Sequence, residues 1–235
     1  MAAGEGSRLA ADGVLEPKPL VAIGGIPQIV RLARSLYALG CAPVTCLIRE
    51  DLSPRLKQLT SDYMDLADLQ CVPARTPSSL HTLALGLEGA PAEPVFCTMV
   101  DTVMRPTDWL RVYDGCRRAL LDGAAGAVAV TPYTGGEGSL YVVLDTAGQI
   151  RELRDGPLSA LVTGGVYALA PSAQSVAREA RSVGVSRVRN FLRQLLALGF
   201  RLDSVQVECI VDLDRASDLR RAVQVLHAPV SVLKA

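Results

Sequence analysis

Two glycines and two basic residues near the N-terminus have the types and spacing to bind a polyphosphate. The sequence reads A-A-G-E-G-S-R from Ala2 to Arg8, and Lys18 follows between two prolines. Glycine lacks a Cβ, so the backbone at Gly4 and Gly6 can turn tightly beside a ligand. Successive N–H groups in such a turn can converge on an anion. Arg8 and Lys18 add two positive charges, and the prolines stiffen the segment that carries Lys18.

Two aspartates could add a divalent cation to this site. Asp101 follows the apolar run 95–100, and Asp212 follows the mostly apolar run 207–211. Carboxylates at the ends of buried strands suit Mg²⁺, which prefers hard oxygen donors and keeps several waters. Spacing alone favours a simpler role for Asp101, as a loop aspartate that caps the next helix. Asp214 is the alternative to Asp212, and it could also cap a helix.

Strands and helices alternate along the chain, which predicts an α/β fold with a mostly parallel sheet covered on both faces. The apolar patterns predict strands over 44–48, 69–72, 95–100, 124–131, 162–169 and 202–211. The helical patterns cover 27–39, 53–59, 76–87, 106–121, 173–183, 186–198 and 216–226. A hairpin over 140–144 and 149–153 predicts a small antiparallel addition. Ligands bind beyond the carboxyl ends of the strands in such sheets, where Asp101 and Asp212 both lie.

The composition argues against several classes of protein. The 235 residues carry 24 basic and 24 acidic side chains, and a net charge of zero argues against binding nucleic acid through a general basic field. No apolar run approaches the roughly 18 residues that span a bilayer, and no signal peptide is visible. The six cysteines are scattered without a C-x-x-C pair. This predicts free thiols in a cytoplasmic protein rather than a metal site or disulfides.

The opening run is followed by P-K-P-L at 17–20, and together they closely resemble the signature of a nucleotidyltransferase family. These enzymes make nucleotide sugars and related activated compounds, and they include the MobA-like NTP transferases. Their pattern is A-A-G-x-G-x-R followed by P-K-x-L. The resemblance implies a Rossmann-like three-layer α/β/α fold with residues 1–235 as one domain. The NTP-binding part would span about 1–131, the acceptor-binding part about 132–211, and a closing helix 212–235.

The resemblance also implies a buried central strand that leads into Ala2, whereas the given sequence begins at Met1. The loss of such a strand would leave two sheet edges unpaired and remove core side chains. We therefore hypothesise that the given sequence starts late. Equal solubility and thermal stability of the chain with and without in-frame upstream codons would contradict this hypothesis.

The resemblance further implies roles in a magnesium-triphosphate site. Backbone amides of the glycine loop would hold the triphosphate, and the loop residues are Ala3, Gly4, Glu5, Gly6 and Ser7. Arg8 would neutralise the leaving pyrophosphate, and Lys18 would bridge the α-phosphate and the acceptor phosphate. V-D-T at 100–102 and the late segment that begins at Asp212 match the family's two metal-binding segments, so the resemblance implies Mg²⁺ on Asp101 and Asp212.

A looser match concerns recognition of the base. Thr76, Ser78 and Ser79 stand where the family recognises the base with backbone groups and small hydroxyl residues. A simple helix cap fits the same residues equally well.

The acceptor site is also matched loosely. Gly164 and Gly165 precede Val-Tyr, and a glycine before Ile/Val-Tyr lines the family's acceptor pocket; close packing of a strand is the alternative. Asp155-Gly156 replaces a Glu-Lys pair that is common in the sugar nucleotidyltransferases. Arg154 or Arg187 could supply the missing positive charge.

We therefore predict a cytoplasmic, Mg²⁺-dependent nucleotidyltransferase. It would transfer a nucleoside monophosphate from a triphosphate to a sugar 1-phosphate and release pyrophosphate. Two other functions fit the residues: a cytidylyltransferase acting on a phospho-alcohol such as phosphocholine, and a nucleotide-binding paralogue without turnover. We expect neither nucleic acid nor a membrane as a partner, and the base, the acceptor and the oligomeric state stay open.

Overall fold

The computed structural model describes residues 1–2, 7–88, 90, 92–132, 138–156, 159–182 and 184–227. Its largest sheet has the strand order β11-β7-β10-β8-β9, and β5 pairs with β10 beside this path. The strands of this sheet are β5 (Val95–Thr98), β7 (Gly126–Thr131), β8 (Leu140–Leu144), β9 (Ile150–Asp155), β10 (Val162–Leu169) and β11 (Leu202–Gln206). β11 is parallel to β7, whereas β10 is antiparallel to both β5 and β7. β5, β7 and β11 therefore run in one direction.

Shorter strands form three further pairs. β1 (Ala22–Ile23) and β2 (Ile26–Pro27) are antiparallel, β3 (Val44–Ile48) and β4 (Leu69–Pro73) are parallel, and β6 (Thr102–Val103) and β12 (Val211–Asp212) are antiparallel. The β8–β9 hairpin is antiparallel, as expected from the sequence.

Residues 1–2 lie between β3 and β5. The Ala2 N–H donates to the carbonyl of Leu47 at 2.9 Å in a parallel bridge, and the amino group of Met1 donates to the carbonyl of Thr98 at 2.7 Å. The Val100 N–H donates to the carbonyl of Met1 at 3.0 Å. These contacts bring the start of the chain close to Asp101.

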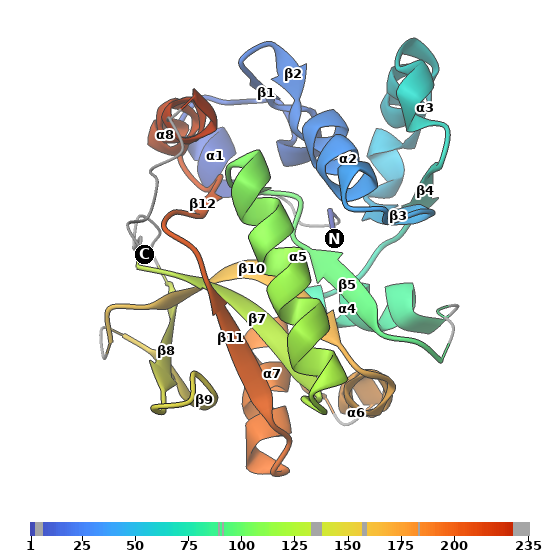
Figure 1. Cartoon of the computed structure of the whole chain (residues 1–235). Coiled ribbons are helices and arrows are strands. Elements are labelled where there is room, and N and C mark those ends of the chain that lie inside the picture. The colour runs from blue at the N-terminus through green and yellow to red at the C-terminus, as the bar shows by residue number, and fades with distance from the viewer. Residues whose placement is uncertain are drawn as a thin grey trace.

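Helices cover the sheet on both faces (Figure 1). The helices of the described residues are α1 (Ser7–Ala11), α2 (Gln28–Ala38), α3 (Ser53–Asp62), α4 (Ser79–Glu88), α5 (Pro106–Leu121), α6 (Pro171–Ser182), α7 (Val188–Ala197) and α8 (Ala216–His227). Short 3₁₀ turns occupy Lys18–Leu20, Glu50–Leu52 and Met64–Leu66.

Successive side chains of β7 belong alternately to two hydrophobic clusters, one on each face of the sheet. Ala127 and Ala129 belong to a cluster that includes residues of α2 and α5, whereas Val128 and Val130 belong to a second cluster with residues of α4, α6 and α7. Successive side chains of a strand point to opposite faces, so β7 is buried on both. The three-layer α/β/α fold with a mostly parallel mixed sheet is thereby confirmed.

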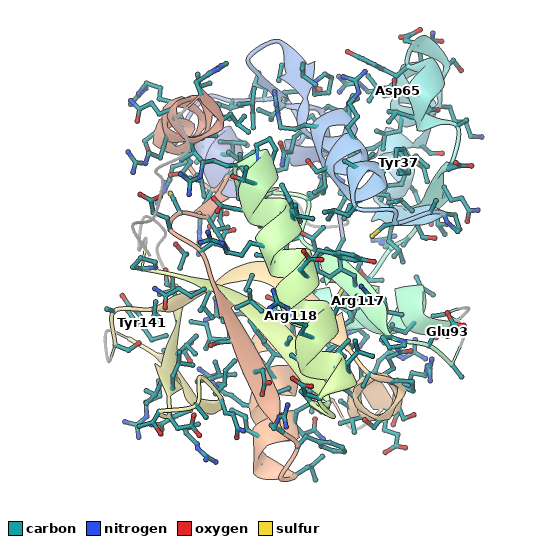
Figure 2. The ribbon with its side chains drawn as sticks, viewed as in Figure 1. Tyr37, Asp65, Glu93, Arg117, Arg118 and Tyr141 are labelled. Carbon is teal, nitrogen blue, oxygen red and sulfur yellow. The ribbon has the colours of Figure 1, made fainter. Side chains whose placement is uncertain are left out.

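Helical spacing explains how α5 sits on the sheet. Trp109, Val112 and Cys116 are buried on its inner side, and Pro106 occupies the first turn, where a missing N–H costs nothing. Arg117 and Arg118 are exposed on the outward side (Figure 2). The helix covers β7 and β11 (Figure 1) and matches the range predicted from the sequence.

The predicted strand over 202–211 is wrong as a single element, because β11 ends at Gln206 and β12 begins at Val211. The intervening segment is held by side chains: the Thr131 hydroxyl donates to the carbonyl of Glu208 at 3.2 Å, and Arg105 pairs with the Glu208 carboxylate at 2.9 Å. After this bend the chain pairs with β6, and Asp212 lies opposite Thr102. Asp212 therefore approaches the site on a separate short strand instead of extending the central one.

Gly165 lies beside this pairing and is constrained both by its backbone conformation and by its neighbours. Its φ is +72°, and a Cβ there would meet the Thr102 hydroxyl oxygen at 2.7 Å. We expect Gly165→Ala to lower the free energy of unfolding by about 2–3 kcal/mol, since it combines a left-handed backbone with a steric clash. Urea unfolding monitored by circular dichroism measures this difference.

Gly13 provides the matched control for this substitution. It has φ +87°, but a Cβ there would meet nothing within 4 Å. Gly13→Ala should therefore show the backbone cost alone, about 1–2 kcal/mol. Equal losses in the two variants would contradict the contribution of the clash with Thr102.

Candidate active site

Lys18 is held between two carboxylates. Its Nζ lies 2.7 Å from Asp101 Oδ2 and 2.6 Å from Asp214 Oδ1. The side chain is 13% exposed, and the carbonyl of Pro17 accepts the Leu20 N–H at 2.8 Å to close the turn that carries it. Burial by itself lowers the pKa of Lys18, but Asp101 and then Asp214 outweigh this and keep the pKa above its ordinary value. Lys18 is therefore a fixed cation at neutral pH.

Arg8 and Lys18 share Asp214 as a partner. Arg8 Nη1 lies 2.9 Å from Asp214 Oδ2, and the Arg8 side chain is about half exposed. The loop that carries Asp214 is held by Asp218, whose buried carboxylate accepts the N–H of Asp214 at 3.0 Å and of Arg215 at 2.7 Å. The Asp12 carboxylate accepts the Ala216 N–H at 3.0 Å and so ties the region after α1 to the start of α8.

Asp212 differs from the other two carboxylates, because within the described residues its side chain has no hydrogen-bond or ion-pair partner. It opens into a cavity and is exposed there. The surrounding protein reduces hydration of the carboxylate and raises its pKa well above the ordinary value. Repulsion from Asp101 and Asp214 acts in the same direction, and Lys18 opposes it. An additional cation beside Asp101 and Asp212 would relieve this repulsion.

The cavity has a volume of about 500 Å³ and carries both signs of charge on its walls. The acidic part of its lining comprises Asp101, Asp212, Asp214 and Asp218, and the basic part comprises Arg8, Arg187 and Arg189. Apolar side chains such as Leu140, Val162 and Ile210 complete the walls. Such a lining suits a ligand that has phosphate groups and a less polar body.

Most of the residues predicted from the sequence meet at this cavity. Its lining includes Arg8, Ser78, Ser79, Asp101, Gly164, Gly165, Arg187 and Asp212. Lys18 joins them through its ion pair with Asp101. Ser7 begins α1, whereas Ala3, Gly4, Glu5 and Gly6 lie outside the described residues.

Thr76 and Arg154 do not line the cavity in the described structure. The Thr76 hydroxyl is hydrogen-bonded to the Thr82 hydroxyl of α4 at 2.6 Å. Arg154 lies on β9 and pairs with Glu152 two residues away. Of the two arginines considered for the acceptor site, Arg187 is the one that the fold brings to the cavity.

Arg189 lines the cavity but was not among the predicted site residues. Its Nη1 lies 2.7 Å from Asp155 Oδ1, and its Nη2 donates to the carbonyl of Gly138 at 2.8 Å. Arg193 also pairs with Asp155 at 2.8 Å, and these two arginines lower the pKa of the Asp155 carboxyl, with Arg193 as the larger cause. The sequence feature that could have indicated Arg189 as a site residue is the basic side of the helix predicted over 186–198.

Asp101 and Asp212 supply two oxygen-donor side chains. Across the part of the chain that the structure describes, no group of three or more His, Cys, Asp or Glu side chains is arranged to hold a metal ion. Because Mg²⁺ usually takes one or two carboxylates plus waters and substrate phosphates, this donor set fits Mg²⁺ bound together with a triphosphate. All six cysteines are free thiols, and no described helix is long and apolar enough to cross a membrane.

Comparisons with known proteins bear on the fold and the family. A search of curated proteins gave no significant match. The inositol-1-phosphate CTP transferase from T. maritima aligns with a TM-score of 0.77 and 14% identity, over 95% of this chain and 94% of that one. A putative glucose-1-phosphate thymidylyltransferase from Bacillus anthracis aligns with a TM-score of 0.80 and 16% identity, over 94% of this chain and 91% of that one. These likenesses show a shared fold.

The sequence itself decides the family. The model of the MobA-like NTP transferase domain matches residues 1–195, which is most of the chain. That range includes the glycine loop, Lys18, Asp101 and Arg187. The chain belongs to the MobA-like NTP transferase family, and it is a nucleotidyltransferase.

Proposed function

We propose that this nucleotidyltransferase transfers a nucleoside monophosphate from a triphosphate to a sugar 1-phosphate, with Mg²⁺ as cofactor and pyrophosphate as the second product. The observation that carries the proposal is the position of Lys18, which is fixed as a cation beside Asp101 at a cavity lined by further cations. An oxygen of the acceptor phosphate attacks the α-phosphorus. The bond from the α-phosphorus to the bridging oxygen breaks, and pyrophosphate leaves with the electron pair.

The residues of the chain act by position and charge in this proposal. Lys18 stabilises negative charge on the α-phosphate, and Arg8 does the same for the leaving pyrophosphate. Asp101 and Asp212 would hold Mg²⁺, which neutralises phosphate charge. We prefer Asp212 to Asp214 as the second ligand of Mg²⁺, because Asp214 is already ion-paired with both Lys18 and Arg8. Asp214 instead aligns these two cations.

The acceptor is proposed as a phosphate monoester. The two solved structures described above are named for a phosphate monoester of a polyol or sugar, and Arg187 and Arg189 provide positive charge at the cavity. A phospho-alcohol such as phosphocholine is the second candidate. It is supported by Asp155, which stands in a segment where sugar nucleotidyltransferases often have Glu-Lys and which is paired here with Arg189 and Arg193.

A pyrophosphate-release screen tests the proposed function. CTP, UTP, dTTP, GTP and ATP would each be combined with glucose 1-phosphate, inositol 1-phosphate or phosphocholine in the presence of Mg²⁺. We expect release with at least one pair, and loss of release when EDTA removes the metal. Arg8→Ala should lower turnover, whereas Arg118→Ala removes an exposed charge from α5 (Figure 2) and serves as the control.

The screen also separates the alternatives. Turnover of phosphocholine alone would replace the sugar 1-phosphate by a phospho-alcohol. Triphosphate binding without Mg²⁺ dependence and without pyrophosphate release would indicate a nucleotide-binding paralogue and contradict the proposal.

A further inference from the structure

Arg187 has an unusual backbone conformation for a residue with a side chain. Its φ is 68° and its ψ is 138°, and among the described residues it is the one non-glycine residue with positive φ. Such conformations are sparsely populated by L-residues and persist only when surrounding contacts impose them. Arg187 immediately precedes α7 and lines the cavity. The contacts that impose this conformation therefore also affect the position of Arg187 at the cavity.

Two serine hydroxyls from the start of α4 make these contacts. The Arg187 N–H donates to Ser78 Oγ at 3.3 Å, and the Val188 N–H donates to Ser79 Oγ at 3.1 Å. Each pair is separated by 109 residues in the sequence. The serines thus hold the first N–H groups of α7, which have no partner inside the helix itself.

Ser78 has little hydrogen-bonding capacity left for a ligand. Its Oγ lies 2.8 Å from His81 Nδ1, and it accepts the His81 N–H at 3.5 Å in addition to the Arg187 N–H. A serine hydroxyl has one donor and two acceptor positions. With the hydroxyl donating to His81 Nδ1, all three are used within the protein. This arrangement does not suit direct recognition of a base by the Ser78 side chain.

We infer that Ser78 and Ser79 are positioning residues for the acceptor: their hydroxyls hold the strained start of α7 so that Arg187 and Arg189 face the cavity. The identity of the anion that these arginines receive, the acceptor's phosphate, rests on the proposed function. Loss of the serine hydroxyls should therefore weaken acceptor binding and leave nucleotide binding nearly unchanged. A direct role in base recognition would have the opposite effect.

Amide hydrogen exchange on the ligand-free full chain tests the contact itself. In Ser79→Ala, and in Ser78→Ala as a second variant, we expect the amides of Arg187 and Val188 to exchange about tenfold faster than in the wild type. Ser79→Thr keeps a hydroxyl and should restore slow exchange. Ser175→Ala, an exposed serine of α6 whose hydroxyl donates to the carbonyl of Pro171, should have no effect. Unchanged exchange in both alanine variants would overturn the inference.

Kinetics test the consequence for binding. With CTP or dTTP and with glucose 1-phosphate or inositol 1-phosphate as acceptor probes, Ser79→Ala should raise the acceptor KM about tenfold and change the triphosphate Kd less than twofold. An equal rise in both constants would overturn the inference and support base recognition. If the wild type turns over none of these pairs, that result counts against the proposed function. In that case the Kd for inorganic phosphate and the Kd for the triphosphate are measured in the wild type and in Ser79→Ala. The inference then expects a rise in the Kd for inorganic phosphate alone.

Two substitutions at Arg187 test the strain. Both Arg187→Gly and Arg187→Ala remove the guanidinium, but glycine accepts positive φ at no steric cost. The glycine variant should therefore have a higher Tm than the alanine variant, by several degrees. Equal Tm values would show that the start of α7 carries no strain and would contradict the inference.

Discussion

Lys18→Ala is expected to lower kcat/KM for nucleotidyl transfer by roughly 10²–10³-fold, the cost of removing one fixed group that stabilises transition-state charge. Lys18 is fixed by Asp101 and Asp214 at 2.7 and 2.6 Å, so it needs no reorganisation as charge develops on the α-phosphate. Lys18→Arg should also be impaired, since a planar guanidinium does not reproduce the compact ammonium between two carboxylates. Steady-state pyrophosphate release measures both effects.

Lys57→Ala is the matched control, because Lys57 is an exposed lysine of α3. It should keep wild-type turnover. A Lys18→Ala variant that folds and retains more than about half of wild-type kcat/KM would rule out the role proposed for Lys18.

The ion pairs of Lys18 also predict how its contribution to stability depends on pH. Because the native pKa is raised above the ordinary value of 10.5, the native state binds this proton more tightly than the unfolded state does. The contribution is fully present below about pH 10.5 and is lost only as pH rises through the higher native pKa. Lys18→Ala should therefore lower the free energy of unfolding throughout the neutral range, and the Tm should be measured beside the kinetics.

Asp212→Asn is expected to lower activity and raise stability in the same protein. The raised pKa of Asp212 means that its contribution to stability is present below the ordinary pKa of 3.8 and is lost as pH rises through the native pKa. Burial and the repulsion from Asp101 and Asp214 both disfavour the ionised form of the side chain. Asparagine removes that repulsion, and the Tm without metal should rise by a few degrees at most, because solvent in the cavity screens the charges.

The nucleotidyl-transfer activity of Asp212→Asn should fall, although its Tm rises. Asparagine is a weaker ligand for Mg²⁺, and metal-ion stabilisation of phosphate charge is worth several kcal/mol, so turnover should fall by about 10²-fold or more. Added Mg²⁺ and triphosphate together should raise the Tm of the wild type more than that of the variant. Differential scanning fluorimetry with and without Mg²⁺ measures both shifts.

Asp214→Asn is the informative comparison. Asp214 is paired with Lys18 and Arg8, so weakening its charge should lower the Tm. A lower Tm for Asp212→Asn as well, or unchanged Mg²⁺ dependence in that variant, would contradict the assignment of Asp212 as the second metal ligand.

The sequence by itself determined most of the elements and the family. The strands over 44–48 and 162–169 and the helix over 106–121 have the boundaries that the patterns predicted, because apolar periodicity, Pro106 and the flanking turns are local signals. The run A-A-G-E-G-S-R from Ala2 to Arg8, read with P-K-P-L at 17–20, was also sufficient to indicate the nucleotidyltransferase family that the comparison then established.

Only the tertiary structure decided which of these groups meet. The alternating pattern over 202–211 resembles one strand, but Thr131 and Arg105 hold the chain at Glu208 and redirect it to β6, which places Asp212 opposite Thr102. Lys18 and Asp214 are 196 residues apart, and the serines at the start of α4 are 109 residues from the start of α7. Contacts at such separations depend on how the strands pair and the helices pack, and local sequence patterns carry no record of that packing.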